Sequence, residues 1–218
     1  MKISISVTSD FICPWCRIAE ARLEKVLRML PSGVVVDVDW KPFELNPDMP
    51  AEGVDRRTYR STKFGSWEYS LRLDQHTVDA GRADNVIFNY SAIQRVPNTF
   101  ASHRLISLAA PGVEKTRLVK RIFQAYFEEG LDIGNVHILS GLAEECGMNR
   151  EDVLKFLSGH SGVENLRQQE ARARLDGINS VPFFDIAGTR VSGAVGADLL
   201  YQHIMGAYHH GKGECDEH

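Results

Sequence analysis

The chain has no long uninterrupted apolar run. A short stretch of apolar and small residues follows Lys2, but the polar residues Thr8, Ser9 and Asp10 end it before it reaches the length of a signal-peptide core. Further along, charged residues recur too often for a stretch of about 20 apolar residues, the length that a membrane-spanning helix requires. We therefore expect a cytoplasmic protein with no membrane partner.

A strong excess of either charge is also missing. The 218 residues include 25 basic and 29 acidic side chains, and the formal net charge is -4. A surface that binds nucleic acid neutralises phosphates with clustered Lys and Arg, and no basic stripe of that kind occurs. We therefore expect no nucleic acid partner.

Cysteine is scarce and unevenly placed, at Cys13, Cys16, Cys146 and Cys215, which excludes a disulfide-stapled scaffold. The Cys-x-x-Cys spacing of the first two is more often redox-active or metal-binding than structural in an intracellular α/β protein. A zinc site needs two further Cys or His ligands at workable spacing, and neither Cys146 nor the C-terminal group of Cys215 and histidines supplies them. We expect no bound metal, and a buried, inert Cys146.

The first forty residues predict one β-α-β unit. Residues 3–7 are typical of a short buried strand, residues 14–30 carry apolar side chains at helical spacing, and the valine-rich segment 34–40 predicts a second strand. A right-handed crossover places the helix start at the carboxyl edge of parallel strands, where open sheets hold their sites. Cys13 is therefore expected at a helix N-terminus on that edge.

Helical patterns replace strand patterns between about residues 55 and 160. The clearest predicted helices cover residues 100–109, 115–128, 138–146 and 150–159. Strand signals return at residues 182–186 and 189–192, where the two-residue connection between them is typical of a tight hairpin. A last helix is predicted over residues 195–207.

The length is too great for one small module and too small for two full-sized domains, so a single core with a large insertion is expected. We predict an α/β domain formed by residues 1–45 and 162–208. A helical insertion would cover residues 46–161, and residues 209–218 would form a flexible tail.

The spacing of Cys13 and Cys16 suits disulfide exchange. A thiolate must attack, and a second thiol must lie close enough to displace the first from the mixed disulfide. The exposed N–H groups and the positive dipole end of the helix favour a thiolate on Cys13, while Cys16 lies one turn later and faces inward. Pro182 directly precedes a predicted strand, where proline is disfavoured, and a cis Val181–Pro182 bond would account for it.

These motifs resemble the thioredoxin superfamily, and within it the DsbA-like group that includes the FrnE and 2-hydroxychromene-2-carboxylate isomerase families and is related to kappa-class glutathione transferases. The FrnE-like branch is the most similar, because it has a dithiol where the isomerases generally have serine. The resemblance rests on Cys13-Pro14-Trp15-Cys16, Pro97-Asn98-Thr99, His103-Arg104-Leu105, residues 177–184 and Ser192-Gly193-Ala194.

The resemblance implies a thioredoxin fold with a large helical insertion between the N-terminal β-α-β unit and the C-terminal β-hairpin and helix. It implies a cis Pro182 that faces the dithiol, a substrate groove between them, and backbone hydrogen bonds from Val181 to a bound peptide or glutathione. Asn98 is a weaker carry-over from the isomerase and transferase side, and it could equally cap the helix that follows.

Other residues near the motif have two interpretations each. We expect Trp15 to be exposed and to contact substrate, and Phe11 to pack in the core. His103 is more typical of a hydrogen-bonded structural residue than of a catalyst. The predicted strand at residues 3–7 lacks the buried acid found in thioredoxins, so the proton acceptor for Cys16 is unassigned; Asp10 is a candidate only for capping the helix.

Three functions of different classes fit the sequence. The first is thiol-disulfide exchange on proteins, peptides or small thiols, with no tightly bound cofactor. The second is a glutathione-dependent isomerase or transferase with glutathione as co-substrate, which needs only one active thiol. The third is a non-catalytic peptide-binding or chaperone module. A monomer and a homodimer both fit, and the direction of electron flow is open.

Overall fold

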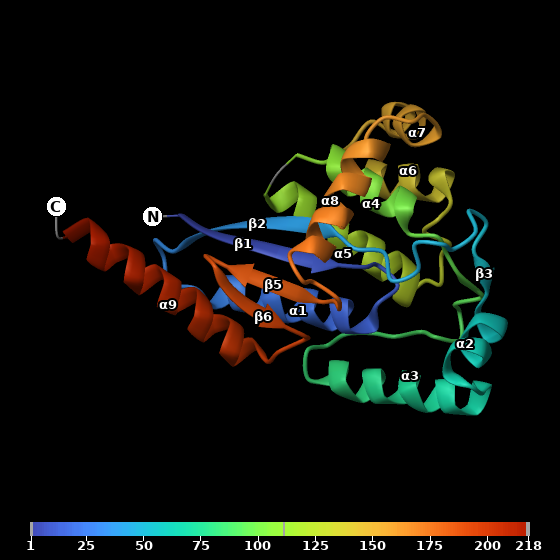
Figure 1. The fold of residues 1–218 in the computed structure, drawn as a ribbon, viewed down its shortest axis with the longest axis horizontal. Coiled ribbons are helices and arrows are strands. Elements are labelled where there is room, and N and C mark those ends of the chain that lie inside the picture. The colour runs from blue at the N-terminus through green and yellow to red at the C-terminus, as the bar shows by residue number, and fades with distance from the viewer. Residues whose placement is uncertain (1, 111, 217–218) are drawn as a thin grey trace.

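The computed structural model of the protein describes residues 2–110 and 112–216, without the side chains of residues 113 and 212–216. Within these residues the chain forms a mixed sheet of four strands in the order β2-β1-β5-β6 (Figure 1). The strands are β1 (Lys2–Ser9), β2 (Val35–Pro42), β5 (Phe183–Ile186) and β6 (Thr189–Ser192). β1 pairs parallel to β2, while β5 runs antiparallel to β1 and to β6.

The strand pattern of the sequence explains how the sheet is buried. Ile3, Ile5 and Val7 alternate along β1 and are at most 1% exposed. Val7 pairs with Phe184 of β5, which is also fully buried. This pairing brings the C-terminal part of the chain beside β1, because β1 is the strand that both halves of the sheet share.

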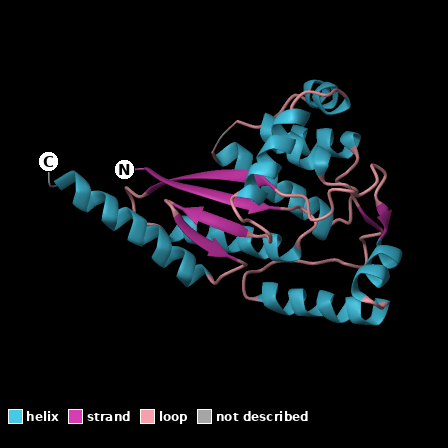
Figure 2. Ribbon diagram, viewed as in Figure 1, coloured by secondary structure: helices cyan, strands magenta, loops and turns pink. Residues whose placement is uncertain are grey.

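Helices cover both faces of the sheet (Figure 2). Helix α1 (Pro14–Met29) confirms the helix predicted at residues 14–30, and it lies behind the sheet in Figure 1, where it contacts α9 (Ala197–Asp216). Helix α8 (Val163–Leu175) lies in front, against β2. α1 buries Ile18, Leu23 and Val26, which share one helix face.

The chain leaves the sheet after Pro42 and returns at Phe183. The helices between these points are α2 (Arg56–Phe64), α3 (Trp67–Arg82), α4 (Phe100–Leu108), α5 (Val113–Phe127), α6 (Val136–Glu145), α7 (Arg150–Ser158) and α8. Those predicted between residues 100 and 159 are confirmed within about two residues at each end. A short antiparallel pair, β3 (Val54–Asp55) with β4 (Arg95–Val96), was not predicted, since two-residue strands carry no periodic signal.

The C-terminal helix is longer than the sequence indicated. Helix α9 covers Ala197–Asp216, so the prediction of a helix ending near residue 207, followed by a flexible tail over 209–218, is wrong as far as Asp216. No proline interrupts this segment, and isolated glycines cost a helix only about 1 kcal/mol each. Residues 217 and 218 lie outside the described part of the chain. Among the described helices none combines the length and apolar character needed to cross a bilayer.

Candidate functional site

Cys13 occupies the position before the first turn of α1. Its backbone is extended (φ -88°, ψ 112°), and its carbonyl accepts hydrogen bonds from the N–H groups of Cys16 (3.0 Å) and Arg17 (3.2 Å). Pro14 follows as the first helical residue, where its missing N–H is not needed. The expected place of Cys13 at a helix N-terminus is thus confirmed.

Both cysteines of the motif are buried, and Cys13 contacts a segment that is distant in the sequence. Cys13 and Cys16 are free thiols, 5% and 1% exposed. The Cys13 thiol donates a long hydrogen bond to the Val181 carbonyl, with 3.7 Å between Sγ and O, although 168 residues separate them. The Val181–Pro182 bond is cis, as predicted. The sheet therefore brings the dithiol and the predicted substrate-binding backbone together.

Burial makes Cys16 a poor acid. Its pKa lies well above the usual value, first because the thiol is removed from water and second because it shares a hydrogen bond and charge repulsion with Cys13. A backbone hydrogen bond at Asp10 acts in the opposite direction. Cys16 therefore holds its proton more firmly than an exposed thiol does.

Asp10 does not cap α1, which corrects that interpretation. Its side chain is fully buried, and its two oxygens are engaged elsewhere: Oδ2 accepts the Leu45 N–H at 2.7 Å, and Oδ1 lies 3.3 Å from Nε2 of His103. The charge of Asp10 also raises the pKa of Cys16. Asp10 is thus a buried carboxylate near the resolving thiol, in the loop after β1 rather than on the strand itself.

A second group of buried acids lies next to His103. Glu44 follows β2 with a fully buried side chain, and its N–H donates to Oε1 of Glu170 at 2.8 Å. Arg167 Nη1 donates to both carboxylates, at 2.5 Å and 3.1 Å. Burial raises the pKa of Glu44 to about 7, the Glu170 charge adds to this, and Arg167 and His103 oppose it. We call Glu44, Arg167 and Glu170 the acidic cluster.

The structure also places the other residues that the sequence singled out. Phe11 is buried with its ring tilted against that of His103, which is itself buried and hydrogen-bonded, so both have the structural surroundings that were favoured. The Asn98 amide is hydrogen-bonded within the protein: Nδ2 donates to the Met49 carbonyl at 2.7 Å, and Oδ1 accepts the Phe100 N–H at 2.9 Å. Trp15 is half-buried rather than exposed as expected, because its ring packs edge-on to His76.

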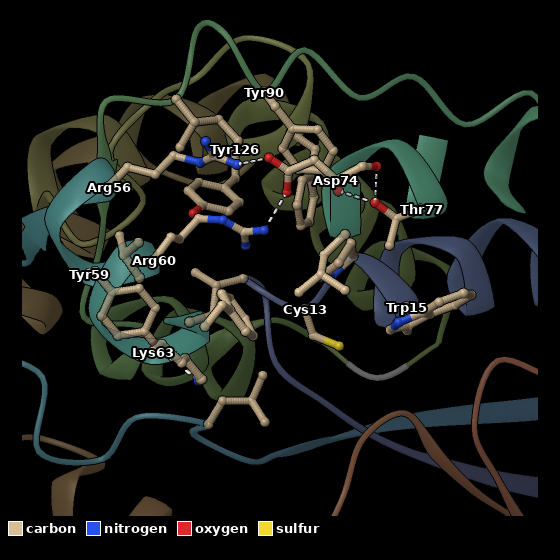
Figure 3. Close-up of a pocket in the computed structure, with 18 of the residues that line it drawn as sticks. Cys13, Trp15, Arg56, Tyr59, Arg60, Lys63, Asp74, Thr77, Tyr90 and Tyr126 are labelled. Atoms are coloured by element: carbon tan, nitrogen blue, oxygen red, sulfur yellow. Dashed lines mark hydrogen bonds and ion pairs between the residues drawn. The ribbon is translucent and has the colours of Figure 1, made fainter. Parts of the chain in front are cut away.

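A cavity of about 310 Å³ opens beside Cys13 and Trp15. Figure 3 shows Cys13, immediately before α1, and Trp15 of α1, together with labelled side chains that α2 and α3 contribute from the helical insertion. Asn98, Val181 and Pro182 are not among its lining residues. The apolar part of the lining is formed by Ile12, Pro14, Trp15, Leu45, Phe64, Leu73, Ile93, Val96 and Phe127.

Three cations and one carboxylate line the same cavity. Asp74 of α3 binds Arg56 and Arg60 of α2, each at 2.6 Å, and all three side chains are mostly buried. Lys63, one turn after Arg60 on α2, donates to the Tyr59 hydroxyl at 2.7 Å. We call Arg56, Arg60 and Asp74 the cavity cluster.

Sequence reasoning did not single out these residues. Charged residues on a polar helix usually face solvent, and only the fold brings α2 and α3 to Cys13. A signal was present, because residues 56, 60 and 63 are spaced by four and three and must share one helix face.

The other cysteines and possible metal ligands lie apart from the site. Cys146 ends α6 and is partly exposed rather than buried as expected, because it lies at the helix end, although burial still raises its pKa. The side chain of Cys215 lies outside the described part of the chain, so its place in the C-terminal group of possible ligands stays a prediction. In the described part of the chain, no three His, Cys, Asp or Glu side chains gather as a metal site requires.

Comparison with known proteins relates the site to others. The sequence profile of the DSBA-like thioredoxin domain family matches residues 4–205. The Bacillus subtilis protein YwbO is 29% identical over 205 residues, which is 94% of this chain and 96% of that protein. A probable DsbA oxidoreductase from Streptomyces coelicolor has a similar structure, with a TM-score of 0.83 and 27% identity over 94% of this chain and 90% of that one.

Two more distant structures share the fold. A 2-hydroxychromene-2-carboxylate isomerase superposes with a TM-score of 0.72 at 15% identity, covering 99% of each chain. The cytosolic disulfide reductase DsbM from Pseudomonas aeruginosa, solved with GSH, has a TM-score of 0.53 at 18% identity and covers 87% of this chain and 89% of that one. At these identities the likeness concerns the fold.

Proposed function

Because the chain belongs to the DSBA-like thioredoxin domain family, we propose that it is a thiol-disulfide oxidoreductase in which Cys13 attacks and Cys16 resolves. The observation that carries this proposal is the meeting of three features. A free thiol lies at a helix N-terminus, a second thiol is buried one turn later, and the Cys13 sulfur lies 3.7 Å from the carbonyl before a cis proline.

The exchange proceeds in two balanced steps. The Cys13 thiolate attacks one sulfur of a substrate disulfide, so that a bond forms between Cys13 and that sulfur while the substrate bond breaks and one thiolate leaves. Cys16 then loses its proton and attacks Cys13, forming the Cys13–Cys16 disulfide and releasing the second thiolate. Two electrons pass from the dithiol to the substrate, and the reverse sequence oxidises a substrate dithiol.

The Val181 backbone supports the binding of an extended substrate. Val181 precedes β5 and is partly buried beside Cys13, so its carbonyl is placed to accept an N–H from a peptide or from glutathione next to the reacting sulfur. Partners of this kind would be protein or peptide disulfides, or glutathione as a co-substrate without a tightly bound cofactor.

Trapping of the mixed disulfide tests the assignment of the two cysteines. In Cys16→Ser, Cys13 still attacks but nothing resolves the adduct, so the protein should accumulate a covalent adduct with insulin or with glutathione disulfide. Cys13→Ser should form no adduct at this site and should lose insulin reduction. Intact mass spectrometry measures the adducts, and Cys146→Ser is the matched control because its thiol lies apart from the cavity.

Full insulin reduction by Cys13→Ser would overturn the proposal. Suppression of aggregation that is indifferent to both cysteines would instead favour a chaperone module. The redox equilibrium of Cys13 and Cys16 in glutathione buffers, followed by differential alkylation, gives the direction of electron flow.

A glutathione-dependent isomerase or transferase is the second candidate. It is supported by the fold shared with the isomerase and by a Cys13 thiol that borders a cavity, where one thiol could hold glutathione against a second substrate. Turnover of an electrophilic aromatic substrate with glutathione that persists in Cys16→Ser would favour this candidate. Loss of all activity in that variant would argue against it.

A further inference from the structure

The cavity beside Cys13 has more positive charge than its own carboxylate can balance. Arg56, Arg60 and Lys63 line it together with one acid, Asp74. Two tyrosines in the lining, Tyr90 and Tyr126, add no negative charge, because burial raises the pKa of each. The cavity therefore carries a net positive charge next to the reactive thiol.

The cations also have donors to spare. Arg60 gives Nε to Ser70 Oγ at 2.6 Å and Nη2 to Asp74, while Arg56 gives Nη2 to Asp74. Among the described residues, no hydrogen-bond partner is found for Nη1 of either arginine. Burial lowers the pKa of Arg60, Asp74 opposes this, and Arg56 adds to it. An anion in the cavity would relieve the repulsion between the two arginines.

The walls beside the cations are apolar. Leu45 and Phe64 line the cavity together with the cations, and Ile12 and Trp15 flank Cys13 in the chain. The volume of about 310 Å³ is at the lower end of the range for small-molecule sites. Such a lining favours a ligand with a compact apolar body and a negatively charged group that reaches the arginines.

We propose that the preferred substrate of the cavity is a small disulfide, or the corresponding thiol, that carries an apolar body and a negatively charged group, held by Arg56, Arg60 and Lys63 with its sulfur at Cys13. This rests on the proposed exchange chemistry and names its substrate class. Cys13 forms a bond to the nearer sulfur, and the farther half leaves as a thiolate carrying the electron pair of the broken bond. A polar anion such as glutathione satisfies only the charged half of the site.

Rates with four disulfides test this selectivity. The protein is prepared with Cys16, Cys146 and Cys215 replaced by serine, so that each rate reports Cys13 alone. The probes are dithiobis(nitrobenzoate), which is aromatic and anionic; dithiodipyridine, aromatic and neutral; glutathione disulfide, polar and anionic; and cystamine, aliphatic and cationic. Each rate is divided by the rate of a free model thiol, which removes the intrinsic reactivity of the probe.

Substitutions on α2 should change these rates by charge. Lys63→Met and Arg60→Met should each slow the nitrobenzoate probe about tenfold, because a charge-assisted contact is lost, and leave dithiodipyridine nearly unchanged. Lys63→Glu should slow the nitrobenzoate probe further and speed cystamine. Arg57→Met is the matched control, since Arg57 is exposed on the same helix and does not line the cavity.

The outcomes separate this proposal from the exchange chemistry. A corrected nitrobenzoate rate no higher than that of glutathione disulfide, or equal slowing of the anionic and neutral probes, overturns the substrate class while Cys13 remains reactive. Absence of any Cys13 adduct, and of a Cys13–Cys16 disulfide in the unsubstituted protein, overturns the exchange function itself. Lys63 is exposed, so its variants test the charge even where Arg60→Met fails to fold.

Discussion

Two clusters of charged side chains with buried acids lie near the loop that carries Cys13, and their charges are out of balance in opposite directions; the arginine of the acidic cluster, Arg167, is 44% exposed. The cavity cluster has two arginines for one aspartate and borders an open cavity. The acidic cluster has two glutamates for one arginine, and Oε1 of Glu44 is buried without a hydrogen-bond partner among the described residues. Excess positive charge thus faces a space that a ligand can enter, whereas excess negative charge is enclosed.

The difference indicates how each imbalance is relieved. A buried charge without its full complement of partners either binds a counter-ion or changes its protonation. Arginine keeps its proton, so only a bound anion would relieve the cavity cluster. A carboxylate can be protonated near neutral pH, and the acidic cluster is relieved in that way at Glu44, whose pKa burial raises to about 7.

The largest effect on folding is expected when the cavity cluster loses its only acid. Asp74→Asn leaves Arg56 and Arg60 buried without a negative partner, and breaking a buried pair in this way costs about 3 kcal/mol of unfolding free energy. Urea unfolding followed by fluorescence measures the change. Asp79→Asn is the control on the same helix, because Asp79 is exposed and its partners, Gln75 and Arg82, lie on that helix too. Equal stability of Asp74→Asn and the unsubstituted protein would show that the pair is solvated.

The acidic cluster should make stability depend on pH. The pKa of Glu44 is raised from 4.5 to about 7 by folding, so the folded state binds more protons between these values, and stability falls as pH rises through that window. Glu44→Gln removes this contribution and should be more stable than the unsubstituted protein by about 1 kcal/mol at pH 8, with little difference at pH 4.5. Glu20, whose pKa burial also raises to about 7, keeps part of the slope.

Unfolding curves across this pH range provide the measurement. Glu164→Gln, on the exposed side of α8, should leave the slope unchanged. A Glu44→Gln protein whose stability follows the same slope as the unsubstituted protein would place the titration elsewhere.

The sequence predicted the dithiol part of the site but neither of the two charge clusters. The predicted thioredoxin fold with a helical insertion is confirmed by the family and by the fold of the Streptomyces structure. The elements that place Cys13, Cys16 and Pro182 are local: a strand, a helix start and a hairpin, each with its own periodicity or turn residues. Their meeting follows from the order of strands in the sheet.

The charge clusters depend on contacts between distant segments. Asp74 meets Arg56 from another helix, and Glu44 meets Glu170 across 126 positions. Local patterns do not indicate which charged side chains become buried, because a charged residue is usually solvated. The same limit explains why Asp10 was assigned only to capping. Its partners, Leu45 and His103, come from the loop after β2 and from α4.

The smallest effect is expected from removing the charge of Asp10, which lies near Cys16. The Asp10 charge contributes to the raised pKa of Cys16, after burial and the contacts with Cys13, so Asp10→Asn should lower that pKa slightly. Resolution of the mixed disulfide requires the Cys16 thiolate, and its rate should therefore rise with pH and be raised by less than about tenfold in Asp10→Asn at pH 7. Stopped-flow release of the second thiol measures this step, and Asp79→Asn, at an exposed acid outside the cavity, should leave its pH profile in place. A slower resolution in Asp10→Asn would mean instead that the Asp10 carboxylate, held by His103, accepts the Cys16 proton.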